Sequence, residues 1–136
     1  MATFESRTRE DLPKPAGAYG HVVRAGSFVY TAGFGPQDPG TGELPDGVAA
    51  QTQATLDNVE RALSTHGLGL ADVVKATVHL QELVRDFGEF NEVYNTRFSD
   101  PLPVRTTVGS DLMKILVEID VVAYKPVSGR ANGRED

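Results

Sequence analysis

The sequence predicts an α+β domain with the element order β-β-α-β-α-β-β, in which two helices pack on one face of a sheet. Two observations support this prediction. The apolar spacing switches repeatedly between a period of about 2 and about 3.6 residues, and runs rich in Gly, Pro and Asp separate the segments. The chain has 136 residues and no internal repeat, which suits one hydrophobic core. We therefore expect a polar, weakly ordered segment over residues 1–14, a single domain over 15–126 and a disordered tail over 127–136.

Strand and helix signals alternate along the first half of the chain. Residues 19–24 and 28–31 favour β structure, and the Ala-Gly-Ser between them indicates a hairpin. Residues 33–47 are dense in Gly, Pro and Asp and predict a loop. Over residues 48–66 the spacing becomes helical, and Gly67 is placed to end the helix. The apolar stripe of this helix is expected to consist of Thr52, Leu56, Val59 and Leu63.

The second half repeats the alternation. Residues 73–80 predict a strand, and Asp86 is expected to cap a second helix that closes before Pro101 and Pro103. Two further strands are expected at residues 104–108 and 115–124. The apolar side of the second helix is expected to consist of Phe87, Phe90, Val93, Tyr94 and Phe98.

The strand patterns predict one apolar and one polar face of the sheet, because successive strand residues alternate in direction. The apolar face is expected to include Val74, Ala76, Val78, Leu80, Ile115, Val117, Ile119 and Val121. The polar face is expected to carry Lys75, His79, Arg105, Glu118 and Asp120. Such a face fits solvation with cross-strand charge pairs, and it equally fits a wall against a neighbouring subunit. The pattern leaves both interpretations open.

The composition argues against several classes of function. A net charge of -6 and a pI near 5.0 argue against nucleic acid or membrane partners. Without cysteine there is no disulfide or thiolate chemistry. His21, His66 and His79 lie in three different elements and show no ligand spacing, so no metal or cofactor is expected. The sequence shows no signal-peptide pattern or long apolar run, which makes the cytoplasm the default compartment.

A series of short motifs runs along the chain in a constant order. They are AGAYGHVV, VYTAGFGPQDPGTGEL, QTQATLDNVERAL, ADVVKATVHL, FNEVYNTRF, PVRTTV and VEIDVVA. Through them the stretch from Tyr19 to Tyr124 resembles the RidA (YjgF) family of imine and enamine deaminases. The resemblance implies a chorismate-mutase-like fold with a mixed sheet, assembled as a homotrimer with sites in the clefts between subunits. It also implies cofactor-free hydrolysis of 2-imino or 2-enamino acids, of the 2-iminobutanoate/2-iminopropanoate type, to a 2-keto acid and ammonia.

The resemblance assigns roles to individual residues. Arg105 matches the family's carboxylate-binding arginine, and its planar fork suits bidentate binding. Glu118 matches the glutamate that orients or activates the attacking water. The remaining matches are substrate-binding positions: Tyr19 and Asn91 line the cleft, Gly33 lets a backbone group approach the ligand, and Thr107 offers a hydroxyl. From the residues alone, an ion pair of Arg105 with Glu118 or Asp120 is the alternative.

The chain also departs from the family pattern around the expected cleft. Ala32 and Phe34 flank the motif glycine where serine and glutamine are common, His21 replaces another glutamine, and the loop at residues 109–114 is short. These departures bear on the identity of the substrate. Two alternative functions remain: a non-enzymatic trimer that binds a small carboxylate metabolite or a protein partner, and an endoribonuclease. The acidic composition argues against the endoribonuclease.

Overall fold

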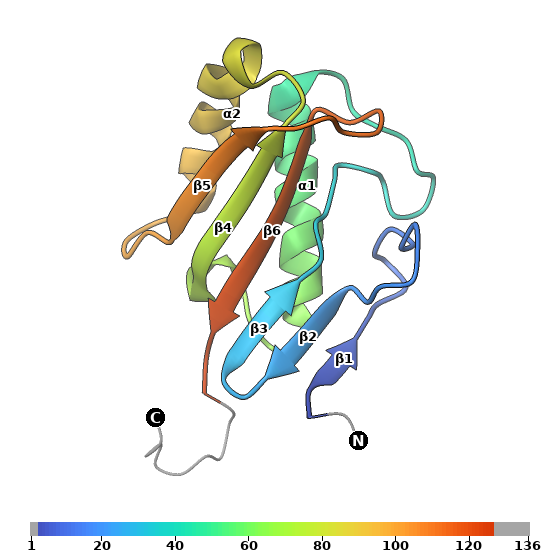
Figure 1. Ribbon diagram of the computed structural model, residues 1–136, viewed down its shortest axis with the longest axis vertical. Coiled ribbons are helices and arrows are strands. Elements are labelled where there is room, and N and C mark those ends of the chain that lie inside the picture. The colour runs from blue at the N-terminus through green and yellow to red at the C-terminus, as the bar shows by residue number, and fades with distance from the viewer. Residues whose placement is uncertain (1–2, 127–136) are drawn as a thin grey trace.

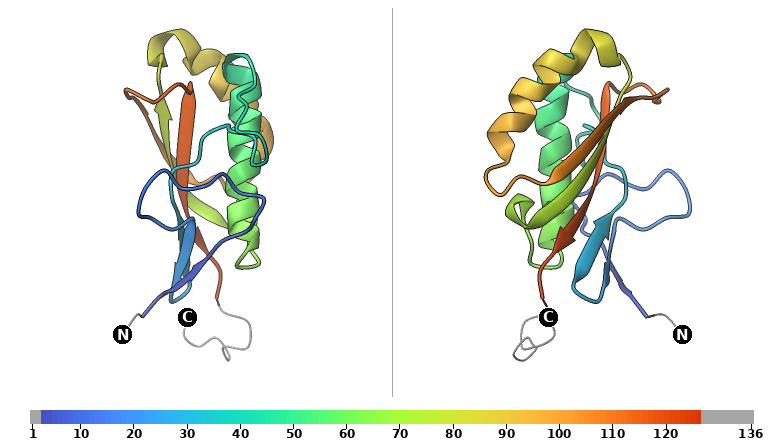
Figure 2. Two further views of the ribbon diagram at one scale, coloured as in Figure 1. Left: turned by 90° about the vertical axis from the view of Figure 1, so that its right-hand side faces the viewer. Right: turned by 60° about the vertical axis from the view of Figure 1, so that its left-hand side comes forward.

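The computed structural model describes residues 3–126, which form a six-stranded mixed sheet with both helices on one face (Figures 1 and 2). The strand order is β1-β2-β3-β6-β4-β5. Only the pair β4–β5 is parallel; the other neighbouring pairs are antiparallel. The elements are β1 (Glu5–Arg7), β2 (Val22–Ala25), β3 (Phe28–Thr31), α1 (Gly47–Ser64), β4 (Val73–Leu80), α2 (Leu83–Arg97), β5 (Val104–Gly109) and β6 (Val117–Tyr124), with a short 3-10 helix at Leu70–Asp72.

The predicted order of strands and helices is confirmed from β2 onward. Strands β3 and β4 have the predicted bounds, whereas β2 starts three residues later than the sequence indicates. Helix α2 begins at Leu83, so Asp86 lies in its first turn and Glu82 occupies the capping position. The predicted stripe of α1 is fully buried, and it packs with Val78, Ile119 and Phe90 in one core between sheet and helices.

The expectation of a weakly ordered N-terminal segment is wrong. Glu5–Arg7 form β1, which pairs with β2, and Leu12 is buried in the core. The buried imidazole of His21 also holds this segment: its Nε2 donates to the Pro13 carbonyl at 2.7 Å, and its Nδ1 contacts the Thr8 hydroxyl. A polar segment can join the edge of a sheet because strand pairing uses backbone hydrogen bonds. The low hydrophobicity of residues 5–7 therefore gave no strand signal in the sequence. The predicted tail at 127–136 lies outside the described residues.

A second correction concerns the start of β4. The pairing of β4 with β6 shifts register between Val73 and Lys75, and this irregularity buries Val73 while leaving Val74 43% exposed. Beyond it, Ala76, Val78 and Leu80 face the core as predicted. The bulge interrupts the simple alternation from which the sequence placed Val74 inside.

The third correction moves Arg105 to the other side of the sheet. In the parallel pair β4–β5, Arg105 is in register with Ala76 and Thr107 with Val78, and both partners face the helices. Arg105 therefore lies under α2, whereas His79 and Glu118 form a cross-strand pair on the open face. Alternation within one strand shows only that Arg105 and Thr107 share a side. The pairing with β4 decides which side it is.

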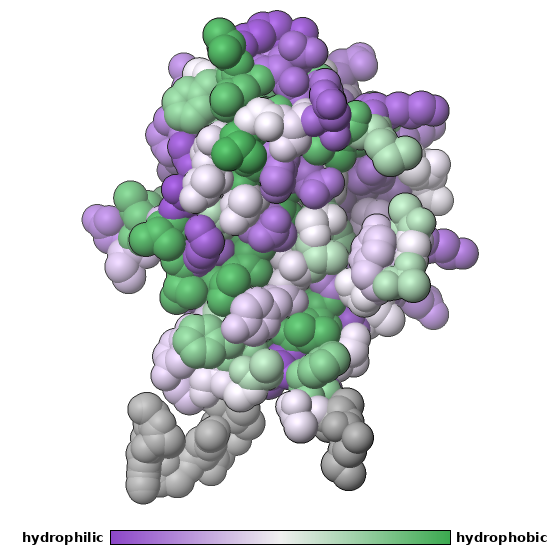
Figure 3. All heavy atoms as spheres, in the orientation of Figure 1, coloured by the Kyte–Doolittle hydropathy of each residue, from purple (hydrophilic) through white to green (hydrophobic). Residues whose placement is uncertain are grey.

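The face of the sheet opposite the helices is uncovered in this chain and carries apolar and polar side chains together (Figure 3). Its exposed apolar residues include Phe28, Tyr30, Val74 and Tyr124, and the rings of Phe28 and Tyr124 contact each other. Within residues 3–126, neither helix has the length and apolar character needed to cross a membrane.

The buried side chain of Asn58 on α1 anchors the long loop at residues 33–46. Its Nδ2 donates to the carbonyls of Gly35 at 2.9 Å and Gln37 at 3.0 Å, and its Oδ1 accepts from Arg61 at 2.7 Å. At the start of the same loop, Phe34 exchanges backbone hydrogen bonds with Ile119 of β6. These contacts hold the loop against the start of β6, where Glu118 lies.

We expect Asn58→Ala to lower the free energy of unfolding by about 2–4 kcal/mol, because it removes three hydrogen bonds and leaves the carbonyls of Gly35 and Gln37 without this partner. Urea denaturation measures the change. Asn95→Ala, the same substitution at an exposed position of α2, is the matched control and should change stability by less than about 0.5 kcal/mol. Equal losses in the two variants would contradict the anchoring role.

Candidate functional site

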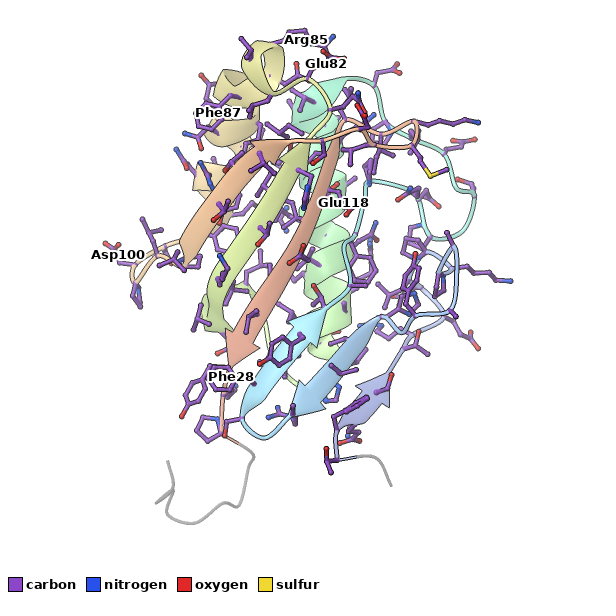
Figure 4. All side chains as sticks on the ribbon, in the orientation of Figure 1. Phe28, Glu82, Arg85, Phe87, Asp100 and Glu118 are labelled. Atoms are coloured by element: carbon purple, nitrogen blue, oxygen red, sulfur yellow. The ribbon has the colours of Figure 1, made fainter. Side chains whose placement is uncertain are left out.

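The predicted site residues divide between two clefts on different sides of the sheet. Arg105 and Asn91 line a cleft of about 730 Å³ between α2 and the start of β5. Tyr19, Gly33 and Glu118 line a larger cleft of about 850 Å³ at the start of β6. Figure 4 labels Glu118 on the open face, and Phe87 and Asp100 near the first cleft. Thr107 is half-buried on β5, on the same side of the sheet as Arg105.

Aromatic rings of α2 hold the guanidinium of Arg105. Its central carbon lies 4.6 Å from the ring centre of Tyr94, 5.5 Å from Phe90 and 5.9 Å from Phe87. Rings that stack against the flat face of a guanidinium fix its orientation. The N–H groups at its edge remain available for hydrogen bonds. No ion pair within residues 3–126 involves Arg105. The alternative of an internal pair with Glu118 or Asp120 is therefore wrong for these residues.

Two buried polar atoms beside Arg105 lack hydrogen-bond partners in the described part of the chain. They are Oδ1 of Asn91 and the hydroxyl of Tyr94, both of whose side chains line the cleft. Burial also raises the pKa of Tyr94, and the nearby charge of Arg105 partly opposes that shift. Buried polar groups are normally paired, so this cleft has unused hydrogen-bonding capacity next to a cation. Arg105 and the Tyr94 hydroxyl can donate to a small anion such as a carboxylate, and Asn91 Oδ1 can accept from an N–H or O–H group of the same ligand.

In the second cleft, Glu118 packs closely against Gly33. A Cβ added to Gly33 would lie 2.5 Å from Glu118 Oε2 and 2.9 Å from its Cδ. The sequence assigned the glycine to close approach by a ligand, and the structure shows close approach by the Glu118 side chain. The absence of a side chain at Gly33 therefore sets the position of the carboxylate.

The other lining residues have distinct roles. The Tyr19 ring is 51% exposed, and its hydroxyl accepts a hydrogen bond from the Ala16 amide at 2.9 Å, which ties the entrance loop together. His79 and Ser110 also line this cleft, with His79 Nδ1 2.7 Å from Ser110 Oγ. Sequence reasoning treated His79 as an ordinary histidine. The available signal was the strand pattern, which placed His79 on the same polar face of the sheet as Glu118.

Asp120 lies two residues from Glu118 on the same face. Desolvation by burial raises the pKa of Asp120 above 3.8, and the charges of His79 and Lys75 reduce the shift. No group of three or more His, Cys, Asp or Glu side chains suited to a metal ion occurs within residues 3–126. The chemistry available in these clefts is thus that of a guanidinium, carboxylates, an imidazole and hydroxyls.

Comparison with known proteins identifies the family. The family model described as Endoribonuclease L-PSP matches residues 9–125. A 2-iminobutanoate/2-iminopropanoate deaminase of Escherichia coli K12 is 36% identical over 121 residues, covering 85% of this chain and 94% of the relative. The chain belongs to the RidA/YjgF family. The resemblance noted in the sequence is thereby confirmed.

Two other RidA/YjgF matches differ in how specific their names are. A protein of Pyrococcus horikoshii, named only as a RutC family protein, is 42% identical over 119 residues, covering 85% of this chain and 94% of the relative. The crystal structure of E. coli TdcF with bound serine has a TM-score of 0.82 at 30% identity, covering 89% of this chain and 98% of that one. The fold class is confirmed, while the names of the relatives differ in what they say about activity.

We expect Gly33→Ala to displace the Glu118 carboxylate, because the new methyl group would overlap the end of that side chain. The end of a glutamate is flexible, so the free energy of unfolding should fall by less than about 1 kcal/mol. A crystal structure of the variant and a denaturation curve measure the two effects. Gly69→Ala is the control, since a Cβ there meets no atom within 4 Å. An unmoved carboxylate would contradict this account.

We expect Asp120→Asn to stabilise the protein at pH 7. A carboxyl whose pKa is raised on folding contributes stability that is present below its unfolded pKa and is lost as the pH rises through the folded value. The wild type should therefore lose stability relative to the variant as the pH rises above about 4. Paired urea denaturation at pH 3.5 and pH 7 measures this difference, and a constant difference at both pH values would contradict it.

Proposed function

We propose that this chain is a hydrolytic deaminase of reactive 2-imino and 2-enamino acids, and that two copies complete each active site in a homotrimer. The observation that carries the proposal is the division of the site residues. A carboxylate-binding half with Arg105 lies on the helix side of the sheet, and a water-orienting half with Glu118 lies on the open side. One small substrate would need both halves.

Assembly into a homotrimer would bring the Arg105 half of one copy to the Glu118 half of another. If the Arg105 half of one copy meets the Glu118 half of the next, the contact joins two different patches, and such a contact closes into a ring when the rotation allows it. The uncovered sheet face, with its exposed Phe28, Tyr30 and Tyr124, supplies apolar surface for such a contact. The trimer implied by the family resemblance would place three equivalent sites between neighbouring copies.

Arg105 suits the task of holding the substrate carboxylate. Its guanidinium keeps its charge at any relevant pH, and the rings of α2 hold its plane while the N–H groups remain free to bind two carboxylate oxygens. Asn91 and Tyr94 offer polar atoms beside it. The named activity of the E. coli relative and the serine bound to TdcF both concern small molecules with a carboxylate group.

Glu118 suits the task of placing the water. A carboxylate at the imine carbon can accept a hydrogen bond from the attacking water and stabilise a protonated iminium electrostatically. In the complete site this carboxylate would also face the guanidinium of Arg105, which would compete with the water proton for its oxygen lone pairs. This makes orientation of water a better role for Glu118 than strong base catalysis. Tyr19 and Gly33 would shape the same half-site, and Thr107 would lie near Arg105.

The test generates 2-iminopropanoate or 2-iminobutanoate in situ and follows release of the keto acid. We expect Arg105→Ala to lower kcat/KM by roughly 10²-fold or more, because a charge-assisted bidentate contact is lost. Glu118→Gln should lower kcat by roughly 10²-fold or more. Arg85→Ala on the exposed side of α2 and Glu10→Gln are the matched controls, and both should keep wild-type rates.

A mixing experiment tests the shared site directly. When the Arg105→Ala and Glu118→Gln chains are refolded together in equal amounts, roughly a quarter of the interfaces in random trimers should join an intact Arg105 to an intact Glu118. About that fraction of wild-type activity should return. Mixed chains that stay inactive, or a protein that sediments as a monomer, would contradict the shared site.

The same assay separates the alternatives. A wild type that accelerates no imino acid but still binds a small carboxylate through Arg105 would be the non-enzymatic binder. Cleavage of RNA that survives Arg105→Ala would favour the endoribonuclease named in the family model's description. The net charge of -6 argues against that activity, because RNA binding normally needs a basic surface.

A further inference from the structure

The cleft around Glu118 contains a second group that can transfer protons. His79 on β4 lies directly opposite Glu118 on β6 in the antiparallel pair, on the open face of the sheet. Directly opposed residues of this kind have Cβ atoms about 5 Å apart. Both side chains line the same cleft as Gly33. An imidazole and a carboxylate therefore face one small volume.

Ser110 fixes the imidazole of His79. Its Oγ lies 2.7 Å from His79 Nδ1. Ser110 is itself held by its backbone amide, which donates to the Leu80 carbonyl at 3.0 Å, and the loop after it is held by Gln81, whose Oε1 accepts from the Leu112 amide at 2.6 Å. The serine thus belongs to an anchored segment.

The hydroxyl partner leaves the imidazole free to change charge. A serine hydroxyl can donate or accept, so it can satisfy Nδ1 whether the ring is neutral or protonated. Within residues 3–126, no hydrogen bond engages Nε2 of His79. The second nitrogen is therefore available to a ligand.

Imine hydrolysis needs a proton donor that Glu118 does not provide. When the water oriented by Glu118 adds to the carbon of the protonated iminium, the C–O bond forms, the electron pair of the C=N π bond moves to nitrogen to give an –NH2 group, and one water proton passes through Glu118 to solvent. To break the C–N bond, the amine nitrogen must take up a proton. The hydroxyl group then becomes the keto C=O as ammonia leaves with the bonding pair, and its proton is released. Histidine is the side chain whose ordinary pKa suits both proton transfers near neutral pH.

We propose that His79, positioned by Ser110, donates the proton to the leaving amine and takes back the hydroxyl proton as the keto acid forms. This inference rests on the proposed deaminase function and assigns a step within it. The charged groups around His79 are Glu118 and Asp120 on β6, Asp111 in the loop after β5, Asp38 and Lys14 on the walls of the cleft, and Lys75 on its own strand.

We expect His79→Gln to lower kcat by roughly 10²-fold with KM within a few-fold of wild type, because a positioned acid acts on the chemical step. The wild type should lose kcat as the pH is raised past neutrality, because a proton donor must carry its proton, and the variant should lack this limb. Ser110→Ala should lower kcat by roughly 10-fold, and Ser110→Thr, which keeps the hydroxyl, should restore most of it. Thr77→Val, on the same face of β4, is the control and should keep wild-type kinetics.

The outcomes separate the two proposals. If Arg105→Ala abolishes activity while His79→Gln keeps both kcat and the pH profile, the role of His79 is overturned and the deaminase function stands. A His79→Gln variant that loses activity without any change in the shape of the pH profile also overturns it, because that result indicates a structural role. A wild type that accelerates no imino acid overturns both proposals. Thermal unfolding of each variant confirms that the fold is kept.

Discussion

The pairing of β4 with its two neighbours decides on which face of the sheet the candidate groups of β4, β5 and β6 lie. Its antiparallel register with β6 sets His79 opposite Glu118 on the open face, and its parallel register with β5 sets Arg105 beside Ala76 on the helix face. A shift of one residue in either pairing would move these side chains to the other side of the sheet. The buried residues Ala76, Val78 and Leu80 hold that register by packing against the helices.

The same packing prepares each half-site for one kind of contact. On the helix side, the rings of Tyr94 and Phe90 support the guanidinium of Arg105 in an apolar setting, where a charge-assisted hydrogen bond is stronger than in water. On the open side, the Phe34–Ile119 bridge and the hydrogen bonds of Asn58 bring the loop with Gly33 against Glu118. Groups held in this way need little reorganisation when a ligand arrives.

The departures from the family pattern are also explained in part by packing. Phe34 is buried and stacks on His21, whose imidazole ties the N-terminal segment to β2. These two residues thus support the wall of the Glu118 cleft. The loop after β5 brings Ser110 to His79. His21 and Phe34 therefore form a packed wall of this cleft, and an imidazole–hydroxyl pair lies in the same cleft as Glu118.

The sequence by itself determined the types and order of the elements, because helix and strand periods are local properties of the chain. It also indicated the family and the residues Arg105 and Glu118, since motifs in a constant order carry that information. It did not find β1, whose pairing depends on backbone groups, or the bulge at Val73, which interrupts the alternation. The tertiary structure alone decided that Arg105 and Glu118 lie on opposite faces, that Gly33 serves the position of Glu118, and that Ser110 meets His79. These relations join residues that are distant in the sequence, and strand register and loop packing create them only when the chain folds.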